Sequence, residues 1–578
     1  MPSVYTYENL KKILATERGQ GLLAQAREAY EALFEGTPIE RPTYADFMHI
    51  FDEGGDTAVC DKIDVKRKLR FFCLQILALD DDRYIGDLEE MIAEFCAQYA
   101  WFSSYHHRDD VNKTFDYAQI DLDTAFMSTA LSLTYAVMEN KLRYDIKLRI
   151  RREIERRVIL PFENNPTYFG LGNTPKSNWI ACQTMGTAYA YLFVFPERLP
   201  LVKKKLFDSV EAYLSGLAED GYCSEGYGYW YHGFGQLAAF LEAYGDVTGE
   251  DLSFLINRPK VQNCLAFGRA AVLKDGFGLP FADHQNPQLK PRTNEFYHIA
   301  YRRVFGEKFA PYDVYDGTCL FVKDENGVPR ANGLIRTDCA YRRIFALSLF
   351  EGERAGGVVE NGTTIFPQGG AFIANRDRYS IVAKAGHNDE NHNHNDVGTF
   401  AFFADGKRIF PDVISHKYDA SYFDDRFRYT AEVFAAGSMG HSVPILDGKN
   451  QVAGIDYKGV ITQSSDDVFE VNLSGAYNTD VSTLKVRYEL CEDRVKIQYT
   501  IDEPQAHALK FRFIAGYEPR EIEGGFAVEG VKLVSREGLP AVAKRVEYLG
   551  HYAGVTVYTV DFDAGEVASG AFEFEIQL

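Results

Sequence analysis

The chain has 578 residues, of which 46% are hydrophobic and 25% are charged. This length exceeds a single domain of about 150 residues, and the composition is that of a globular chain rather than a disordered or fibrous one. Asp and Glu outnumber Lys and Arg by 83 to 62, giving a net charge of −21 that opposes non-specific binding to nucleic acid or to an anionic membrane surface. We therefore expect at least two domains, with neither nucleic acid nor a membrane as a partner.

The cysteines and the N-terminal segment indicate in which cellular compartment the protein is expected. The nine cysteines are scattered and include no CxxC pair, which favours reduced thiols over a disulfide framework or a zinc ribbon. The N-terminal segment lacks the apolar run of a signal peptide, and no later stretch approaches the about 18 to 20 apolar residues of a membrane helix. We expect a cytoplasmic protein, unless a leader has been removed.

Up to about residue 335 the apolar residues recur at helical spacing. Turn-rich pieces such as Asp220-Gly221 separate these stretches, and no sequence repeat is detectable. Four stretches show the spacing: Leu10-Ile13-Leu14, Phe71-Leu74-Leu77, Phe126-Ala130-Leu133-Ala136 and Leu237-Phe240-Leu241-Tyr244. The pattern predicts a helical toroid or solenoid.

Two loops in this helical part combine cations with aromatic or amide groups. The segment 101–121 contains Tyr105-His106-His107-Arg108, and the segment 172–179 presents Lys176, Asn178 and Trp179 at the start of a helix. Either loop can serve a binding site. The alternatives are a solvated surface loop for the first segment and an ordinary helix N-cap for the second.

A third segment, residues 219–232, is a glycine-punctuated run of tyrosines that leads into a helix. Core packing does not require four tyrosines here. Aromatic rings stack on sugar faces, and a tyrosine oxygen can carry a proton when neighbouring cations lower its pKa. The alternative is a tyrosine-rich wall between two helices.

From about Tyr341 the pattern changes to alternation and short hairpins. Residues 400–410 form a strand, an Asp405-Gly406 turn and a return strand, and residues 484–501 repeat this form around Cys491-Glu492-Asp493. Helices followed by strands predict separate α and β domains rather than a βαβ sheet, and no glycine-rich nucleotide loop follows a strand.

Five of the thirteen histidines fall within residues 387–441. His392 and His394 are two apart, so on an extended strand they share a face, and Asp412 lies on the return strand of the following hairpin. His441 opens a later strand-like segment. Two imidazoles, one carboxylate and a water would complete a tetrahedral zinc-type site, whereas the alternative is a polar loop that binds metal adventitiously.

Together, HNHNDVGTFAFFADGKRIFPDV (392–413), GHSVPILDG (440–448), EGYGYW (225–230) and SNW (177–179) resemble the heparinase II/III-like polysaccharide lyases. The resemblance spans most of the chain. It implies an α+β multidomain fold in which an incomplete (α/α) toroid, residues 1–335, precedes an antiparallel β-sandwich, residues 336–578. It also implies a lyase that cleaves 4-linked uronic-acid-containing glycans, such as hyaluronan, chondroitin or heparan-type chains, by β-elimination to unsaturated uronate products.

The same resemblance implies a divalent metal, with zinc preferred, held by His394, Asp412 and His441. Tyr229, Asn178 and His392 match the catalytic positions. Tyr227 and Tyr231 keep the tyrosine assignment open by one helical step. The family's histidine beside the asparagine is Trp179 here, so His392 or His232 would have to replace it. Substrate-binding residues are expected among His232, Trp179, Tyr231, Glu225, Arg108, Lys176 and Arg426.

Three alternatives to this function stay open. An oligoalginate lyase would use the same chemistry on another uronate, and syn or anti elimination is not fixed by the motifs. A toroid-fold glycoside hydrolase would need two carboxylates, for which Glu225 and Asp121 are the suggestive pair. A non-catalytic carbohydrate-binding protein would keep the aromatic residues but would not need the Asn, Tyr and His set. The sequence gives no indication of oligomeric state.

Overall fold

The structure is a computed structural model that describes residues 3–49, 58–102, 120–164, 178–283, 303–306, 321–323, 329–331, 339–349, 359–389, 392–417, 421–422, 429–430, 433–550 and 554–578. The chain divides into two compact units. The first comprises Met1–Gly216, His232–Ile256 and Arg292–Gly357, and the second comprises Leu217–Tyr231, Asn257–Pro291 and Val358–Leu578. The units interleave along the chain, and the division into residues 1–335 and 336–578 stays a prediction.

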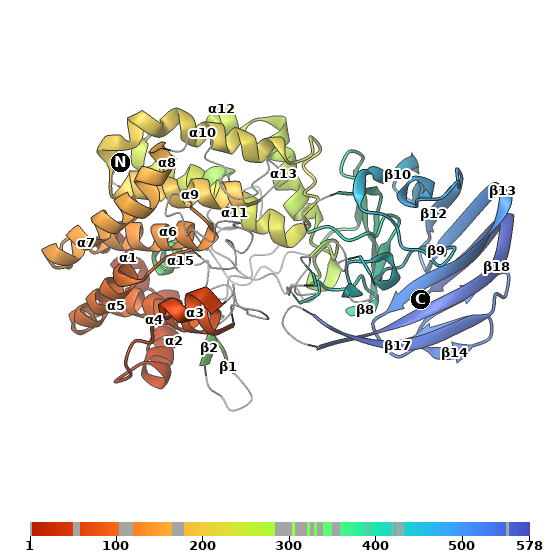
Figure 1. Ribbon diagram of the computed structural model, residues 1–578, viewed down its shortest axis with the longest axis horizontal. Helices are drawn as coiled ribbons and strands as arrows, with labels where there is room; N and C mark the ends of the chain where they lie inside the picture. Colours follow the sequence, from red (N-terminus) through yellow and green to blue (C-terminus); the bar gives the residue numbers. More distant parts are fainter. Residues whose placement is uncertain are drawn as a thin grey trace. The chain divides into compact units, whose positions relative to one another are not determined.

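The first unit is built mainly from helices (Figure 1, red to yellow, with residues 340–348 in green). They are α1 (Tyr7–Leu14), α2 (Glu17–Leu33), α3 (Tyr44–Met48), α4 (Ala58–Asp80), α5 (Ile85–Ala97), α6 (Leu122–Val137), α7 (Tyr144–Ile154), α8 (Leu160–Asn164), α9 (Asn178–Phe193), α10 (Leu199–Ser215), most of α11 (Tyr227–Thr248), α12 (Ser253–Ile256) and α15 (Ala340–Ser348). Thr6, Thr16 and Asp121 cap α1, α2 and α6 by accepting hydrogen bonds from backbone N–H groups. The residues of the predicted stripes, such as Leu10 and Leu74, are buried, except Ala130 and Ala136, which are half-buried. The predicted helical N-terminal part is confirmed.

One element near the end of the first unit differs from the prediction. Residues Ala340–Ser348 form helix α15, whereas the sequence pattern predicted strands from about Tyr341. Tyr341, Ile344 and Phe345 are all buried, and their spacing of three and four residues makes a helical stripe. The short pair β1 (Phe321–Lys323) and β2 (Pro329–Ala331) was not predicted.

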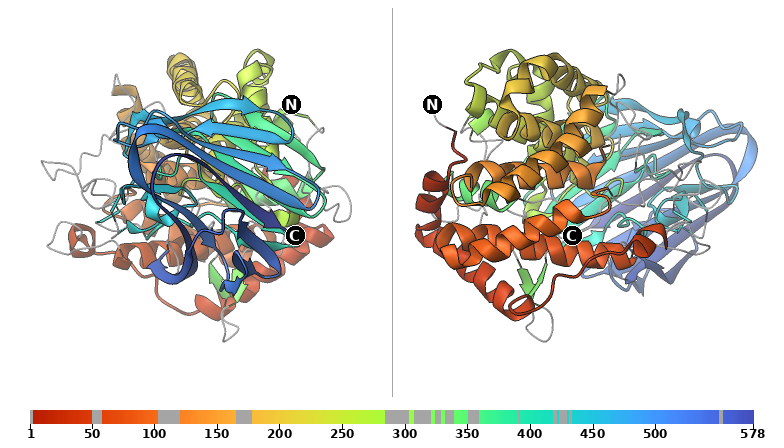
Figure 2. Two further views of the ribbon diagram at one scale, coloured as in Figure 1. Left: turned by 90° about the vertical axis from the view of Figure 1, so that its right-hand side faces the viewer. Right: turned by 60° about the vertical axis from the view of Figure 1, so that its left-hand side comes forward.

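The second unit holds helix α13 (Pro259–Ala270) and two antiparallel sheets (Figure 1 and Figure 2). The smaller sheet has the order β3-β4-β5-β7-β8, with β3 (Gly362–Phe366), β4 (Ala371–Asn375), β5 (Tyr379–Lys384), β7 (Phe400–Ala404) and β8 (Lys407–Phe410). The larger sheet has the order β14-β15-β16-β18-β13-β12-β11-β10-β6, with β17 beside β18 and β9 beside β13. Its strands are β6 (Gly386–Asn388), β9 (Pro444–Leu446), β10 (Gly454–Ser464), β11 (Val468–Asn472), β12 (Leu484–Leu490), β13 (Arg494–Ala515), β14 (Arg520–Ile522), β15 (Gly525–Val528), β16 (Val531–Ser535), β17 (Ala541–Leu549) and β18 (Gly554–Gln577).

The two sheets share one hydrophobic core. The rings of Phe372 on β4 and Phe469 on β11 stack with centroids 5.1 Å apart, and those of Phe400 on β7 and Tyr488 on β12 lie 5.7 Å apart. Each pair joins a strand of one sheet to a strand of the other, so the sheets form a sandwich. The predicted antiparallel β-sandwich is therefore confirmed.

Both predicted hairpins are present. Strands β7 and β8 pair antiparallel through a turn in which Asp405 and Gly406 have φ angles of 48° and 74°. Two consecutive positive φ angles are the signature of a type I′ turn, which matches the right-handed twist of the strands. Strands β12 and β13 pair in the same way across residues 491–493.

The described cysteines agree with the expectation of reduced thiols. Seven of the eight are buried, Cys491 is partly exposed, and no disulfide joins any two of them. Across the ranges given above, every helix is too short or too polar to cross a membrane.

Candidate active site

The first turn of helix α11 places the tyrosine run in the second unit. Gly226, just before the helix, has a φ angle of 87°, and a Cβ built there would lie 2.5 Å from the carbonyl oxygen of Phe281. Only glycine permits so close an approach. As a result, the residue just before α11 lies against the segment that ends at Asp283.

The tyrosines of this turn have different environments. Tyr227 is buried and stacks on Trp230 with centroids 5.8 Å apart, and the Trp230 indole donates a hydrogen bond to the carbonyl oxygen of Cys264 (2.8 Å). Tyr229 is only partly buried, and its ring lies parallel to that of His392 with centroids 3.8 Å apart and an interplanar angle of 11°. Two predicted site residues are thus brought ring to ring.

The segment around His392 is not the extended strand that was predicted. Residues 392–399 form a turn and a loop before β7, and His392 itself has a φ angle of 57°. This left-handed conformation, uncommon for a side chain with a Cβ, re-aims the backbone between the two histidines. His392 and His394 still converge, because both rings face the same carboxylate.

That carboxylate belongs to Asp283, which sequence reasoning missed. Its Oδ2 lies 2.8 Å from Nδ1 of His392, its Oδ1 lies 3.1 Å from Nε2 of His394, and it also accepts a hydrogen bond from the Tyr422 hydroxyl. Burial alone would raise the pKa of Asp283, but the bonds from the two histidines outweigh it and hold the pKa well below its usual range. A single Asp after an apolar segment carries no local signal of this role.

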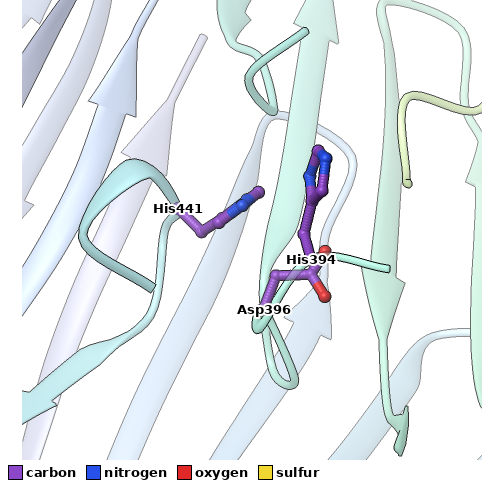
Figure 3. Close-up of side chains that lie close together, drawn as sticks. All are labelled: His394, Asp396 and His441. Carbon is purple, nitrogen blue, oxygen red and sulfur yellow. The ribbon is translucent and has the colours of Figure 1, made fainter. Parts of the chain in front are cut away.

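Behind Asp283, three buried side chains form a cluster that fits a metal ion. His394, Asp396 and His441 each offer a ligand atom within 4.8 Å of the other two. In Figure 3, His394 and Asp396 project from one segment, and the ring of His441 extends toward them from another. Asp396 was not predicted as a ligand, although it follows His394 by two residues as His394 follows His392.

Asp412, a predicted ligand, bonds to His441. Its Oδ1 lies 2.5 Å from Nδ1 of His441, while Nε2 of the same ring lies 2.9 Å from the carbonyl oxygen of Ala435. A carbonyl and a carboxylate both only accept hydrogen bonds, so the ring must carry a second proton or share a cation with Asp412. Burial lowers the pKa of His441, but the Asp412 carboxylate outweighs that effect and the net pKa is raised.

Two buried atoms of this cluster lack partners among the described residues, Nδ1 of His394 and Oδ2 of Asp396, and so does Oδ2 of Asp412, which bonds to His441 through its other oxygen. The other oxygen of Asp396 accepts a hydrogen bond from Lys384. Buried acceptors without a partner are costly unless a cation satisfies them, and a mixed nitrogen and oxygen set suits zinc. The residues present therefore fit a divalent metal.

Three predicted residues belong to the first unit. Asn178 is the first residue of α9 and is buried, Trp179 is partly buried, and the rings of His232 on α11 and Phe126 on α6 form a T-shaped pair with centroids 5.6 Å apart. A Cβ built at Gly233 would lie 3.1 Å from the Cβ of Asn178, so α11 closely approaches the start of α9. Their catalytic and substrate-binding roles stay predictions.

The other predicted residues are distributed as follows. Glu225 is buried just before α11, and Tyr231 is partly buried in its first turns. The candidate cations Arg108, Lys176 and Arg426 lie outside the described residues, and their roles stay predictions.

No protein-family model and no curated protein matches the chain. Several solved structures match over nearly its whole length. A crystal structure of heparinase III is 12% identical, with a TM-score of 0.62, 96% of this chain covered and 88% of the other. A mutant heparan sulfate lyase from Pedobacter heparinus is 12% identical, with a TM-score of 0.56 and coverages of 99% and 88%. The chondroitin AC lyase of Streptomyces coelicolor A3 in complex with chondroitin sulphate is 12% identical, with a TM-score of 0.57 and coverages of 99% and 82%. The chain has the fold of these lyases, which confirms the fold implied by its motifs.

Proposed function

We propose that this protein is a polysaccharide lyase that cleaves 4-linked uronic-acid-containing glycans by β-elimination. The observation that carries the proposal is the parallel contact of Tyr229 and His392, 3.8 Å between ring centroids, in a chain with the fold of heparinase III and chondroitin AC lyase. Glycosaminoglycans come first among the substrates, because the structural neighbours include lyases of that class. Oligoalginate is the second candidate.

Elimination requires one group that removes a proton and one that returns a proton. The C5 proton leaves to a base, the C4–C5 double bond forms, and the electron pair of the C4–O bond departs with the leaving oxygen, which then takes up a proton. Tyr229 can perform both transfers in a syn elimination, and His392 can take the C5 proton in an anti elimination. The adjacent uronate carboxylate gains charge in the transition state, and the resemblance assigns its stabilisation to Asn178.

We assign a divalent metal, with zinc preferred, to His394, Asp412 and His441, and we add Asp396 as a donor. The ion would neutralise the two carboxylates and fix the loops that carry them. Four protein donors leave little need for a bound water, so the ion would serve stability rather than chemistry. Because His392 is two residues from the proposed ligand His394, the ion would also hold the backbone next to His392 in place.

The hydrolase alternative is less well supported. It needs two carboxylates at the scissile bond, and Glu225 and Asp121 were the suggestive pair. The Asp121 carboxylate accepts a hydrogen bond from the backbone N–H of Thr124 (2.7 Å) and caps helix α6, which already accounts for its presence.

Incubation with a panel of uronic polysaccharides tests the proposal. The panel comprises hyaluronan, chondroitin, heparosan, heparan sulfate and alginate, and the readouts are ultraviolet absorbance and product size. We expect ultraviolet-absorbing unsaturated products from at least one glycosaminoglycan with wild-type protein and none with Tyr229→Phe. Shortened glycan chains without that absorbance would show that the protein is a hydrolase and not a lyase. Glycan chains that stay intact with every substrate of the panel would refute both the lyase and the hydrolase.

A further inference from the structure

The carboxylate of Asp283 connects the histidine at the proposed reaction site to a histidine of the proposed metal site. Asp283 is 2% exposed. Its Oδ2 meets Nδ1 of His392 (2.8 Å) and the Tyr422 hydroxyl, and its Oδ1 meets Nε2 of His394 (3.1 Å). No site prediction from the sequence included this residue.

The chemistry of a carboxylate determines where the protons are. An ionised carboxylate accepts hydrogen bonds and donates none, so each ring nitrogen that faces Asp283 must carry a hydrogen. In a neutral imidazole the lone pair is then on the other nitrogen, which is Nε2 in His392 and Nδ1 in His394. One carboxylate therefore selects opposite tautomers in two histidines that are two residues apart.

These tautomers match what each ring needs. Nδ1 of His394 is a buried atom without a partner in the described part of the chain, in the cluster with Asp396 and His441. A lone pair there is what a metal ion requires, and ligating histidines usually donate their other N–H to a carboxylate or carbonyl. A lone pair on Nε2 of His392 is what a base requires.

The backbone around the carboxylate is strained in a way that serves this placement. Ala282, the residue before Asp283, has a φ angle of 62°, and His392 has a φ angle of 57°. Such conformations are unfavourable for residues with a Cβ and persist only where the surrounding structure enforces them. One strained residue, Ala282, directly precedes Asp283, and the other, His392, is the residue that Asp283 contacts.

We propose that Asp283 is a positioning residue that fixes the tautomer and orientation of His392 for proton transfer and, through its second oxygen, directs Nδ1 of His394 to the metal. The part that concerns His392 rests on the proposed function. The part that concerns His394 rests on the geometry of the metal cluster alone.

The substitution Asp283→Asn separates this role from simple packing. An amide of the same shape has one accepting oxygen and one donating nitrogen, so it can keep only one of the two tautomers. We expect kcat to fall by about 10²- to 10⁴-fold with KM changed less than about threefold, the size of a lost proton-transfer group. We expect zinc affinity to fall by about 10- to 100-fold, as for other carboxylates behind a ligating histidine.

The matched control is Asp447→Asn. Asp447 also bonds to a histidine, with its Oδ2 3.0 Å from Nδ1 of His507, outside the site. The Asp447→Asn variant should have the kcat and the zinc affinity of the wild-type protein. Wild-type kcat and zinc affinity in folded Asp283→Asn would overturn the proposal, and so would losses of the same size in Asp447→Asn.

A measurement on the wild-type protein does not depend on any variant folding or on activity. The zinc-loaded protein, labelled with ¹⁵N-histidine and assigned with His392→Gln and His394→Gln, should show His392 with hydrogen on Nδ1 and His394 with hydrogen on Nε2. The reverse tautomer in either ring would overturn the proposal. If the glycan panel gives no lyase activity while both tautomers and the zinc effect are found, the proposed function fails and the role of Asp283 at His394 stands.

Discussion

Removal of the proposed metal should destabilise the second unit by several kcal/mol. Without an ion, the cluster and the neighbouring Asp412 have three buried atoms without partners among the described residues: Nδ1 of His394, Oδ2 of Asp396 and Oδ2 of Asp412. A buried unsatisfied polar atom costs about 1–3 kcal/mol, so three atoms cost at least about 3 kcal/mol. For a unit of this size about 2–4 °C of melting temperature corresponds to 1 kcal/mol, which gives a shift of about 6 °C or more.

The assay combines metal analysis with thermal melting. Purified protein should contain one equivalent of zinc-like metal, and a chelator that removes it should lower the melting temperature by at least the shift above. His394→Ala should lose both the metal and the chelator response. His507→Ala, which breaks the histidine–aspartate pair with Asp447 outside the cluster, should keep both. Protein without stoichiometric metal, or a melting temperature that the chelator leaves unchanged, would refute the metal assignment.

Two further predictions concern Tyr229 and a buried glutamate of the first unit. Tyr229→Phe keeps the ring stacked on His392 but removes the hydroxyl oxygen, so turnover should fall by at least about 10²-fold with the melting temperature unchanged. Tyr227→Phe should stay active, and the reverse pattern in steady-state rates would move the catalytic assignment to Tyr227. Burial raises the pKa of Glu242 from 4.5 to about 7, so the folded state holds its proton more tightly and the free energy of unfolding should fall by about 3 kcal/mol as pH rises through that range. Denaturant unfolding at pH 5 and pH 8 should show this loss in wild type and not in Glu242→Gln, and an equal loss in both would contradict it.

The spacing of apolar residues and the turn sequences predicted those helices and hairpins whose formation depends on residues close together in the chain. The stripes at helical spacing and the two hairpins are present, because apolar periodicity and the Asp405-Gly406 turn act within a few residues. Helix α15 was missed, since Tyr341, Ile344 and Phe345 form a stripe of little more than one turn that resembles the start of a strand. A short apolar run does not separate helix from strand.

The candidate site was predicted where its residues are close in sequence. His392, His394 and their neighbours stand out as a cluster, and the structure brings His392 to Tyr229. Asp283 could not be predicted, because its role depends on the approach of Gly226 to Phe281 and on two left-handed residues. These are long-range and strained features that no periodicity reports.

The mass of the products tests the central claim most directly. The wild-type protein is incubated with the glycan it degrades best, and the products are analysed by mass spectrometry together with ultraviolet absorbance. Elimination breaks the C4–O bond without adding water, so we expect products that carry a double bond and whose masses add up to that of the chain that was cleaved. Products that are heavier by one solvent water and lack the absorbance would show hydrolysis and contradict the account.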